Sequence, residues 1–221
     1  FTTKFNDESP IWNENKSLLE KKISQTKLKK IIVCDNYAFK SSLIGDNYFK
    51  FFNKIISRLA SFKNSTLIIP IEDILFKKEN YKELLNVISH FIIKSKKNGV
   101  QLSFEVQVPL KTILKFKKDL NNRFFKITFD TGNIFLIENN NKSFLNYFNK
   151  TKNFVNHIHL KDRDLQGNNV VLGTGIVNFR MFLKKLKKIN YKQNITFETN
   201  RGKNCLLTAK NNLKFVKKII F

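Results

Sequence analysis

The sequence predicts an α/β fold, a (β/α)8 TIM barrel, on three observations. Short apolar segments alternate with longer segments whose apolar residues recur at helical spacing. This alternation requires a parallel sheet with right-handed crossovers. Several of the short segments end in polar residues, which would collect at the carboxyl-terminal mouth of such a barrel. A chain of 221 residues fits a single domain, residues 1–221, and no linker or repeat interrupts it.

The first half of the chain contains three predicted strands separated by helices. Residues 1–15 have no clear period, so we expect a loop there. In the segment 79–97 apolar residues recur at helical spacing, and Asn98-Gly99 is a typical end for that helix. The expected strands are Lys30–Cys34, Thr66–Ile71 and Val100–Val108, and the expected helices are Ser17–Lys27, 46–62, Glu79–Lys97 and Leu110–Leu120.

The second half repeats this order. The expected strands are Phe125–Asp130, Asn153–Asp162 and Ile195–Glu198, and the expected helices are Lys142–Asn149, Asn178–Ile189 and Ala209–Ile220. Six strands are thus indicated. Because a complete barrel typically takes about 250 residues, a first strand missing upstream of Phe1 and one vestigial strand are both open alternatives.

Composition narrows the class of protein. The formal net charge of +24 would suit a nucleic-acid partner, but the lysines are spread along the chain at places where helices face solvent, so we do not expect one. No apolar run approaches the roughly 20 residues that span a bilayer, so no membrane segment is expected. Cys34 and Cys205 form no paired pattern, which favours free thiols in a reducing compartment and a cytoplasmic location.

The segment Asn153–Asp162 carries two histidines on one side of a predicted strand. Residues two apart in a strand point the same way, so His157 and His159 face one space. Three other predicted strands end in a polar, apolar, polar triplet: Ser103-Phe104-Glu105, Thr128-Phe129-Asp130 and Thr196-Phe197-Glu198. In a closed barrel the last residues would converge, which predicts a metal site made of Glu105, Asp130, His159 and Glu198.

Four motifs carry a resemblance to a known family. They are Phe-Asp-Thr-Gly-Asn at 129–133, His-Ile-His-Leu-Lys-Asp-Arg at 157–163, Leu-Gly-Thr-Gly-Ile-Val-Asn-Phe at 172–179 and Ile-Thr-Phe-Glu-Thr at 195–199. In content, order and spacing they resemble the sugar phosphate isomerases and epimerases of the xylose-isomerase-like TIM-barrel superfamily. The resemblance implies a divalent metal held by Glu105, Asp130, His159 and Glu198, with the two glutamates as acid/base pair.

The predicted chemistry is proton transfer next to a carbonyl of a sugar or sugar phosphate, through an enediolate. A divalent ion would stabilise that enediolate as a Lewis acid, and two carboxylates would move the proton. Oxygen ligands with one imidazole suit Mn²⁺, Mg²⁺ or Co²⁺ better than a structural Zn²⁺, although Zn²⁺ stays among the expected ions.

Further residues near the strand ends are candidates for substrate binding. Asn133 resembles a family position near the substrate, where relatives often have His. Lys161, Arg163 and Arg201 follow strand ends and are predicted to bind a phosphate or sugar hydroxyl, with salt bridges as an equal alternative. His157 is either a further ligand or substrate contact, or a hydrogen-bond partner of a neighbouring ligand.

Three other functions stay open. An inosose-type dehydratase would use the same metal site. A DNA-repair endonuclease of the AP type resembles the His-x-x-Asp and Gly-x-Gly elements, but that chemistry resembles a three-metal site with many histidines, and this chain has three. A catalytically degenerate binding barrel is disfavoured because buried carboxylates repel one another without a cation. A homo-oligomer is left open.

Overall fold

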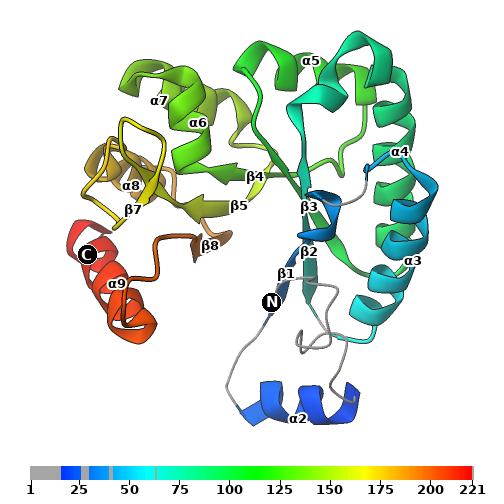
Figure 1. Cartoon of the computed structure of the whole chain (residues 1–221), viewed down its shortest axis with the longest axis horizontal. Helices are drawn as coiled ribbons and strands as arrows, with labels where there is room; N and C mark the ends of the chain where they lie inside the picture. Colours follow the sequence, from blue (N-terminus) through cyan, green and yellow to red (C-terminus); the bar gives the residue numbers. More distant parts are fainter. Residues whose placement is uncertain (1–15, 26–29, 40–41, 63, 221) are drawn as a thin grey trace. The chain divides into compact units, whose positions relative to one another are not determined.

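The main sheet contains six strands among the residues that the structure describes. The structure is a computed structural model that describes residues 16–25, 30–39, 42–62 and 64–220, so the loop expected over residues 1–15 lies outside the described residues. Within them the strand order is β1-β2-β3-β4-β5-β8, and the pairs β1–β2, β2–β3 and β5–β8 are parallel (Figure 1). The predicted fold class is therefore confirmed, with the six strands that the sequence indicated and fewer than the eight of a complete barrel.

The chain divides into two compact units. One consists of Phe1–Val106 with Lys111–Ile127, and the other of Gln107–Leu110 with Thr128–Phe221. Each unit is described below by itself, and the single domain over residues 1–221 stays a prediction.

The first unit contains three neighbouring parallel strands. Val33 of β1 lies opposite Leu67 of β2, and Leu67 lies opposite Leu102 of β3. The strands are β1 (Ile31–Cys34), β2 (Ser65–Ile71) and β3 (Gln101–Val106). The helices are α2 (Lys16–Gln25), the short η1 (Tyr37–Phe39), α3 (Asp46–Ala60), the short η2 (Asp73–Phe76), α4 (Lys78–Lys97) and α5 (Leu110–Leu120), which belongs to this unit from Lys111 on.

Aromatic packing joins the helices of this unit to each other. Phe52 of α3 and Phe91 of α4 are fully buried, and their rings stack with centroids 3.9 Å apart. Helices α3 and α4 run side by side in Figure 1. Burial of such large rings is a main source of stability in a core, so this contact fixes α3 and α4 to each other.

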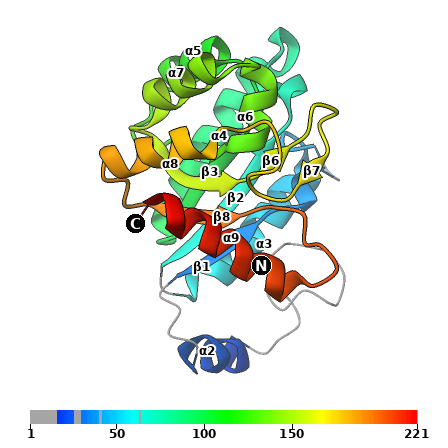
Figure 2. The ribbon, with the colours of Figure 1, turned by 90° about the vertical axis from the view of Figure 1, so that its left-hand side faces the viewer.

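The second unit contains the histidine strand and its neighbours. In it β5 and β8 are parallel, while β6 and β7 form a short antiparallel hairpin. Helices α8 and α9 pack together (Figure 2). The elements are β4 (Ile127–Asp130), α6 (Thr131–Glu138), α7 (Asn141–Thr151), β5 (Val155–Leu160), β6 (Asp162–Arg163), β7 (Asn169–Val170), α8 (Phe179–Lys188), β8 (Asn194–Phe197) and α9 (Cys205–Ile220).

A phenylalanine cluster orients strand β4. Phe129 is buried against Phe144 and Phe148 of α7 and stacks on Phe182 of α8, with ring centroids 5.2 to 5.5 Å apart. Because successive side chains of a strand point to opposite sides, Asp130 points away from this cluster. The apolar packing of one side of β4 therefore presents the Asp130 carboxylate on the other.

Several element boundaries differ from those expected. Helix α6 and the β6–β7 hairpin were not predicted, α9 begins at Cys205 rather than Ala209, and β8 ends at Phe197, so Glu198 directly follows the strand. Both cysteines are free, as expected. Among the described helices, none combines the length and the apolar character that a membrane span requires.

Candidate metal centre

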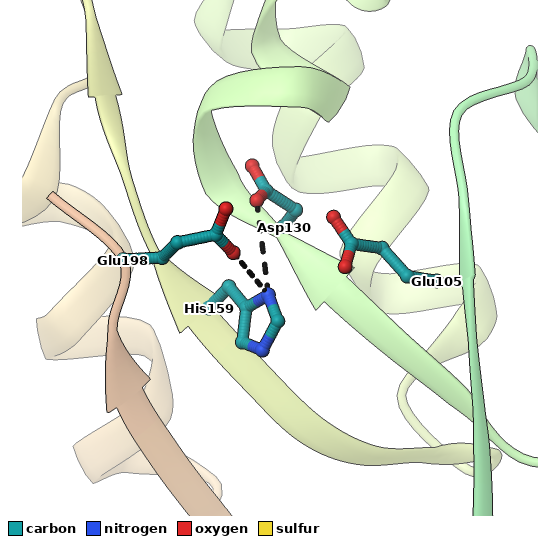
Figure 3. Close-up of side chains that lie close together, drawn as sticks. All are labelled: Glu105, Asp130, His159 and Glu198. Carbon is teal, nitrogen blue, oxygen red and sulfur yellow. Dashed lines mark ion pairs between the residues drawn. The ribbon is translucent and has the colours of Figure 1, made fainter. Parts of the chain in front are cut away.

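His159 lies beside two carboxylates of the second unit. It is the penultimate residue of β5 and is 2% exposed. Its Nδ1 lies 2.6 Å from Oε2 of Glu198 and 3.9 Å from Oδ2 of Asp130 (Figure 3). The three residues come from the carboxyl-terminal ends of β5, β8 and β4, as the sequence predicted for them.

Asp130 serves two purposes with its two oxygens. It is fully buried, ends β4 and caps α6, because its Oδ1 accepts a hydrogen bond from the backbone N–H of Asn133 at 2.8 Å. Its Oδ2 lies 2.9 Å from Nζ of Lys161. The cap fixes the orientation of the carboxylate, so Oδ2 is the oxygen left for the centre.

Glu198 follows β8 and is the more accessible of the two carboxylates. Its side chain is 45% exposed, and its backbone N–H donates to the carbonyl of Leu160 at 3.0 Å, which extends the β5–β8 pairing past the end of β8. Burial would raise the pKa of Glu198, but the hydrogen bond and charge of His159 and the charge of Lys161 outweigh it and lower that pKa to about 2. Glu198 is therefore ionised at neutral pH.

Lys161 bridges the same two carboxylates. Its Nζ lies 2.9 Å from Oδ2 of Asp130 and 2.7 Å from Oε1 of Glu198, and the residue is 4% exposed. Burial would lower the pKa of Lys161, but the two carboxylates outweigh it and raise that pKa. Lys161 directly follows β5, four positions after His157 and two after His159. The alternation of side chains that starts in β5 is therefore the sequence signal for this position.

Glu105 lies in the first unit. It is the penultimate residue of β3, is half-buried and lies opposite Pro70 of β2. Asp130, His159 and Glu198 of the second unit, drawn in Figure 3, belong to a group of residues that could hold a metal ion. Within the second unit, one ligand atom from each of its three members lies within 4.8 Å of the others. Two carboxylates and one imidazole of the second unit are donors that fit a hard divalent ion.

His157 lies outside this group. It is fully buried, its Nε2 lies 2.9 Å from Oγ1 of Thr196, and its ring meets the ring of His159 edge-on with centroids 5.1 Å apart. This arrangement fixes the ring of His157 and packs it against His159. Both roles that the sequence left open for His157 stay predictions.

Arg163 and Asn133 form a pair next to Asp130. Nη2 of Arg163 donates a hydrogen bond to Oδ1 of Asn133, and Nη1 donates to the carbonyl of Gly167 at 2.6 Å. Asn133 is 7% exposed and also donates its backbone N–H to Asp130. Arg201 is exposed between β8 and α9, and within the described part of the chain it makes no ion pair with the candidate ligands.

The glycine segment after β7 is organised by Asp162, a residue that the sequence placed in a motif but to which it gave no structural role. Asp162 is fully buried; its Oδ2 accepts backbone hydrogen bonds from Gly173 at 2.9 Å and Gly175 at 2.8 Å, and its Oδ1 accepts from Val177 at 3.2 Å. A Cβ on Gly175 would lie 2.2 Å from the carbonyl oxygen of Arg163, so only glycine fits there. The backbone N–H groups through which a glycine-rich segment could bind a phosphate are thus already hydrogen-bonded to Asp162.

Thr131 is a second motif residue to which the sequence gave no structural role. Its hydroxyl accepts from the backbone N–H of Lys161 at 2.9 Å and lies 2.7 Å from the carbonyl of the same residue. No pattern singled out this threonine, because its partner lies 30 positions away in the chain. The contact ties the start of α6 to the segment that carries Lys161.

Comparison with known proteins gives a family and a fold. The family model described as xylose isomerase-like TIM barrel matches residues 14–219. No curated protein matches the chain significantly.

Three solved structures illustrate the likeness. The D-psicose 3-epimerase of Clostridium cellulolyticum H10, solved with D-tagatose, has a TM-score of 0.78 at 14% identity, over 96% of this chain and 86% of that one. The probable 3-DHS dehydratase AsbF of Bacillus anthracis has a TM-score of 0.72 at 14% identity, over 91% and 82%. A xylose isomerase-like TIM barrel protein of Mycobacterium smegmatis, in complex with magnesium, has a TM-score of 0.70 at 14% identity, over 96% and 80%. At such identities the likeness concerns the fold alone.

Proposed function

The chain belongs to the xylose isomerase-like TIM barrel family, and on that premise we propose that it is a divalent-metal-dependent isomerase or epimerase of a sugar or sugar phosphate. The observation that carries the proposal is the group of Asp130, His159 and Glu198 at three strand ends. The likeness to epimerases such as the D-psicose 3-epimerase supports the class of reaction. Proton transfer next to a carbonyl is the shared chemistry.

In this proposal Glu105, Asp130, His159 and Glu198 hold the ion. The set offers three carboxylates and one imidazole, which suits Mn²⁺, Mg²⁺ or Co²⁺, and less closely Zn²⁺. Bound there, the ion would supply Lewis-acid stabilisation of negative charge on oxygens next to the reacting carbon. The likeness to a family member in complex with magnesium supports a divalent ion of this kind.

Glu105 and Glu198 are the proposed acid/base pair. Glu198 can accept a proton because its carboxylate is ionised at neutral pH. A substrate can reach it because its side chain is 45% exposed. Glu105 is half-buried at the end of β3. Removal of a proton by one carboxylate and its return by the other would change the configuration of a carbon or move a carbonyl.

The proposed substrate contacts lie around the ligands. Asn133 and Arg163 are paired next to Asp130 and are suited to bind sugar hydroxyls or a phosphate. Lys161 is held between the carboxylates, and Arg201 is exposed near Glu198 in the sequence. His157 would act through His159, on which its ring packs.

A dehydratase is the second candidate. The likeness to the probable 3-DHS dehydratase favours it, because dehydration next to a carbonyl begins with the same proton removal. An AP-type endonuclease is less well supported. The chain has only three histidines, and one of them, His90, lies on α4 of the first unit with its ring against Phe49.

Metal analysis tests the proposal. Purified protein should contain or bind about one divalent ion per chain, and its melting temperature should fall on chelation and rise on adding Mn²⁺, Mg²⁺ or Co²⁺. The loaded protein should then interconvert ketose or aldose substrates, with or without phosphate. Absence of divalent-ion binding, with no shift of the melting temperature, would contradict the proposal. The catalytically degenerate binding barrel would then be the favoured function. About three zinc ions per chain would instead favour the endonuclease.

A further inference from the structure

Lys161 and the proposed ion use the same carboxylates. Nζ of Lys161 lies 2.9 Å from Oδ2 of Asp130, the oxygen that the cap of α6 leaves for the centre, and 2.7 Å from Oε1 of Glu198. The other oxygen of Glu198 faces His159 at 2.6 Å. A cation of the protein itself therefore already joins two of the groups proposed to bind the metal.

The position of Lys161 is fixed by its surroundings. Its backbone is hydrogen-bonded on both sides to the hydroxyl of Thr131, and the residue is 4% exposed. Its side-chain Cγ passes Gly132 so closely that a Cβ at that glycine would lie 3.0 Å away. The contacts with Thr131 and Gly132 thus direct the ammonium group to the carboxylates, and this group is not a solvated surface charge.

We propose that Lys161 is an internal counter-cation of the metal centre: it stabilises the empty centre and lowers its affinity for the divalent ion. This inference rests on the proposed function, since it requires that Asp130 and Glu198 bind a divalent ion. It assigns Lys161 a role beyond substrate binding, namely control of how tightly the centre holds its metal.

The argument follows from the charges in a binding cycle. In the empty centre the ammonium group of Lys161 faces two carboxylates with a combined charge of about −2. When a dication binds to the same carboxylates, their charge is offset, and the attraction that held Lys161 is largely lost. A group that stabilises the empty state more than the loaded state must weaken binding, because the two effects are linked. A further ligand carboxylate would make the empty centre and the metal-loaded centre more negative by the same amount. Lys161 would therefore still weaken metal binding.

The opposite role makes the opposite prediction. If Lys161 only orients the ligands, its removal should weaken metal binding, as loss of an orienting partner typically does by about 10- to 100-fold. If Lys161 is a counter-cation, removal of its charge should tighten metal binding. The sign of the change in affinity therefore distinguishes the two roles.

The experiment uses the full chain and Mn²⁺ alone. Calorimetry gives the dissociation constant for Mn²⁺ of the parent protein, of K161M and of K161Q, and melting temperatures are measured in chelator. Met keeps the apolar stem of Lys161 without its charge, and Gln keeps a hydrogen-bond donor in case Met is poorly tolerated. The control is K184M, because Lys184 is exposed on α8 and its loss changes the net charge by the same amount.

We expect K161M and K161Q to bind Mn²⁺ about tenfold more tightly or better, within the usual range of coupling between two sites. Both should melt at a lower temperature in chelator and gain more on adding Mn²⁺ than the parent, while K184M should match the parent. If the parent binds Mn²⁺ and both variants bind it equally or more weakly, the counter-cation role is wrong but the metal centre stands. If the parent binds no Mn²⁺, the inference fails. The proposed function fails with it only if Mg²⁺, Co²⁺ and Zn²⁺ also leave the melting temperature of the parent unchanged.

Discussion

Nδ1 of His159 lies 2.6 Å from Oε2 of Glu198, and this contact joins the end of β5 to the residue that follows β8. It depends on the register of the two strands, in which His159 lies opposite Thr196. The pairing extends past β8 through the backbone hydrogen bond from Glu198 to Leu160. Because the sheet register sets this geometry, side-chain changes at the two residues can be interpreted as changes to the centre rather than to the fold.

Replacing Glu198 with Gln should abolish turnover while the fold persists. Gln keeps the shape of the side chain but cannot accept a proton, so kcat should fall by at least about 100-fold, the lower end of what general acid–base catalysis contributes. Stability should change little because the side chain is 45% exposed. The measurement is kcat on a substrate found by screening, together with the melting temperature.

The matched control for this variant is Glu83→Gln on the exposed side of α4, which removes one carboxylate far along the chain from the centre. It should leave kcat unchanged. A fully active E198Q protein would remove Glu198 from the acid/base role.

Replacing His159 with Ala should lower the metal content. The imidazole is the nitrogen donor of the proposed ligand set, and its loss leaves two close carboxylates without this neighbour. We expect substoichiometric metal in the purified protein and at least about tenfold weaker Mn²⁺ binding, since loss of a ligand should cost no less than loss of an outer partner. His90→Ala, on α4, is the comparison. Unchanged metal stoichiometry in H159A would show that His159 is not a metal ligand.

The sequence predicted the fold because strand burial and helix periodicity agreed along the chain. It did not predict α6, since Ile134, Phe135, Leu136 and Ile137 follow one another without a polar side, so no helical period is visible. The β6–β7 hairpin was missed because each of its strands has only two residues. A strand of two residues is too short to show the alternation of polar and apolar residues by which strands are recognised in a sequence.

The candidate site was predictable in its donors but not in its internal cation. Asp130, His159 and Glu198 end apolar strands, which is a pattern that a sequence displays. Lys161 was predicted to bind substrate or to form a salt bridge, and it makes salt bridges with Asp130 and Glu198; its substrate role stays a prediction. Whether a lysine binds substrate or forms a salt bridge depends on the distances between side chains. The alternation of side chains along a strand does not give these distances.

Replacing Asp162 with Ala should destabilise the fold. The carboxylate satisfies the backbone N–H groups of Gly173, Gly175 and Val177, and burying such donors without a partner typically costs about 1–3 kcal/mol each when water cannot replace it. We expect the free energy of unfolding to fall by at least about 2 kcal/mol in urea titrations. Asp164→Ala, which alters an exposed carboxylate bonded to Asn168, should have a smaller effect. Equal effects of the two changes would contradict the role given to Asp162.

The stability contributed by Glu198 should depend on pH in a defined direction. Its pKa is lowered from 4.5 to about 2 in the folded chain, so on acidification the unfolded chain binds the proton first. The contribution is therefore complete above about pH 4.5 and is lost as the pH falls through about 2. Since the side chain is 45% exposed, solvent screening limits the contribution to about 1 kcal/mol. Urea unfolding of the parent and of E198Q, both metal-free, should give a stability difference that shrinks between pH 4.5 and 2. A difference that stays constant over this range would show that His159 and Lys161 do not hold Glu198 in its ionised form.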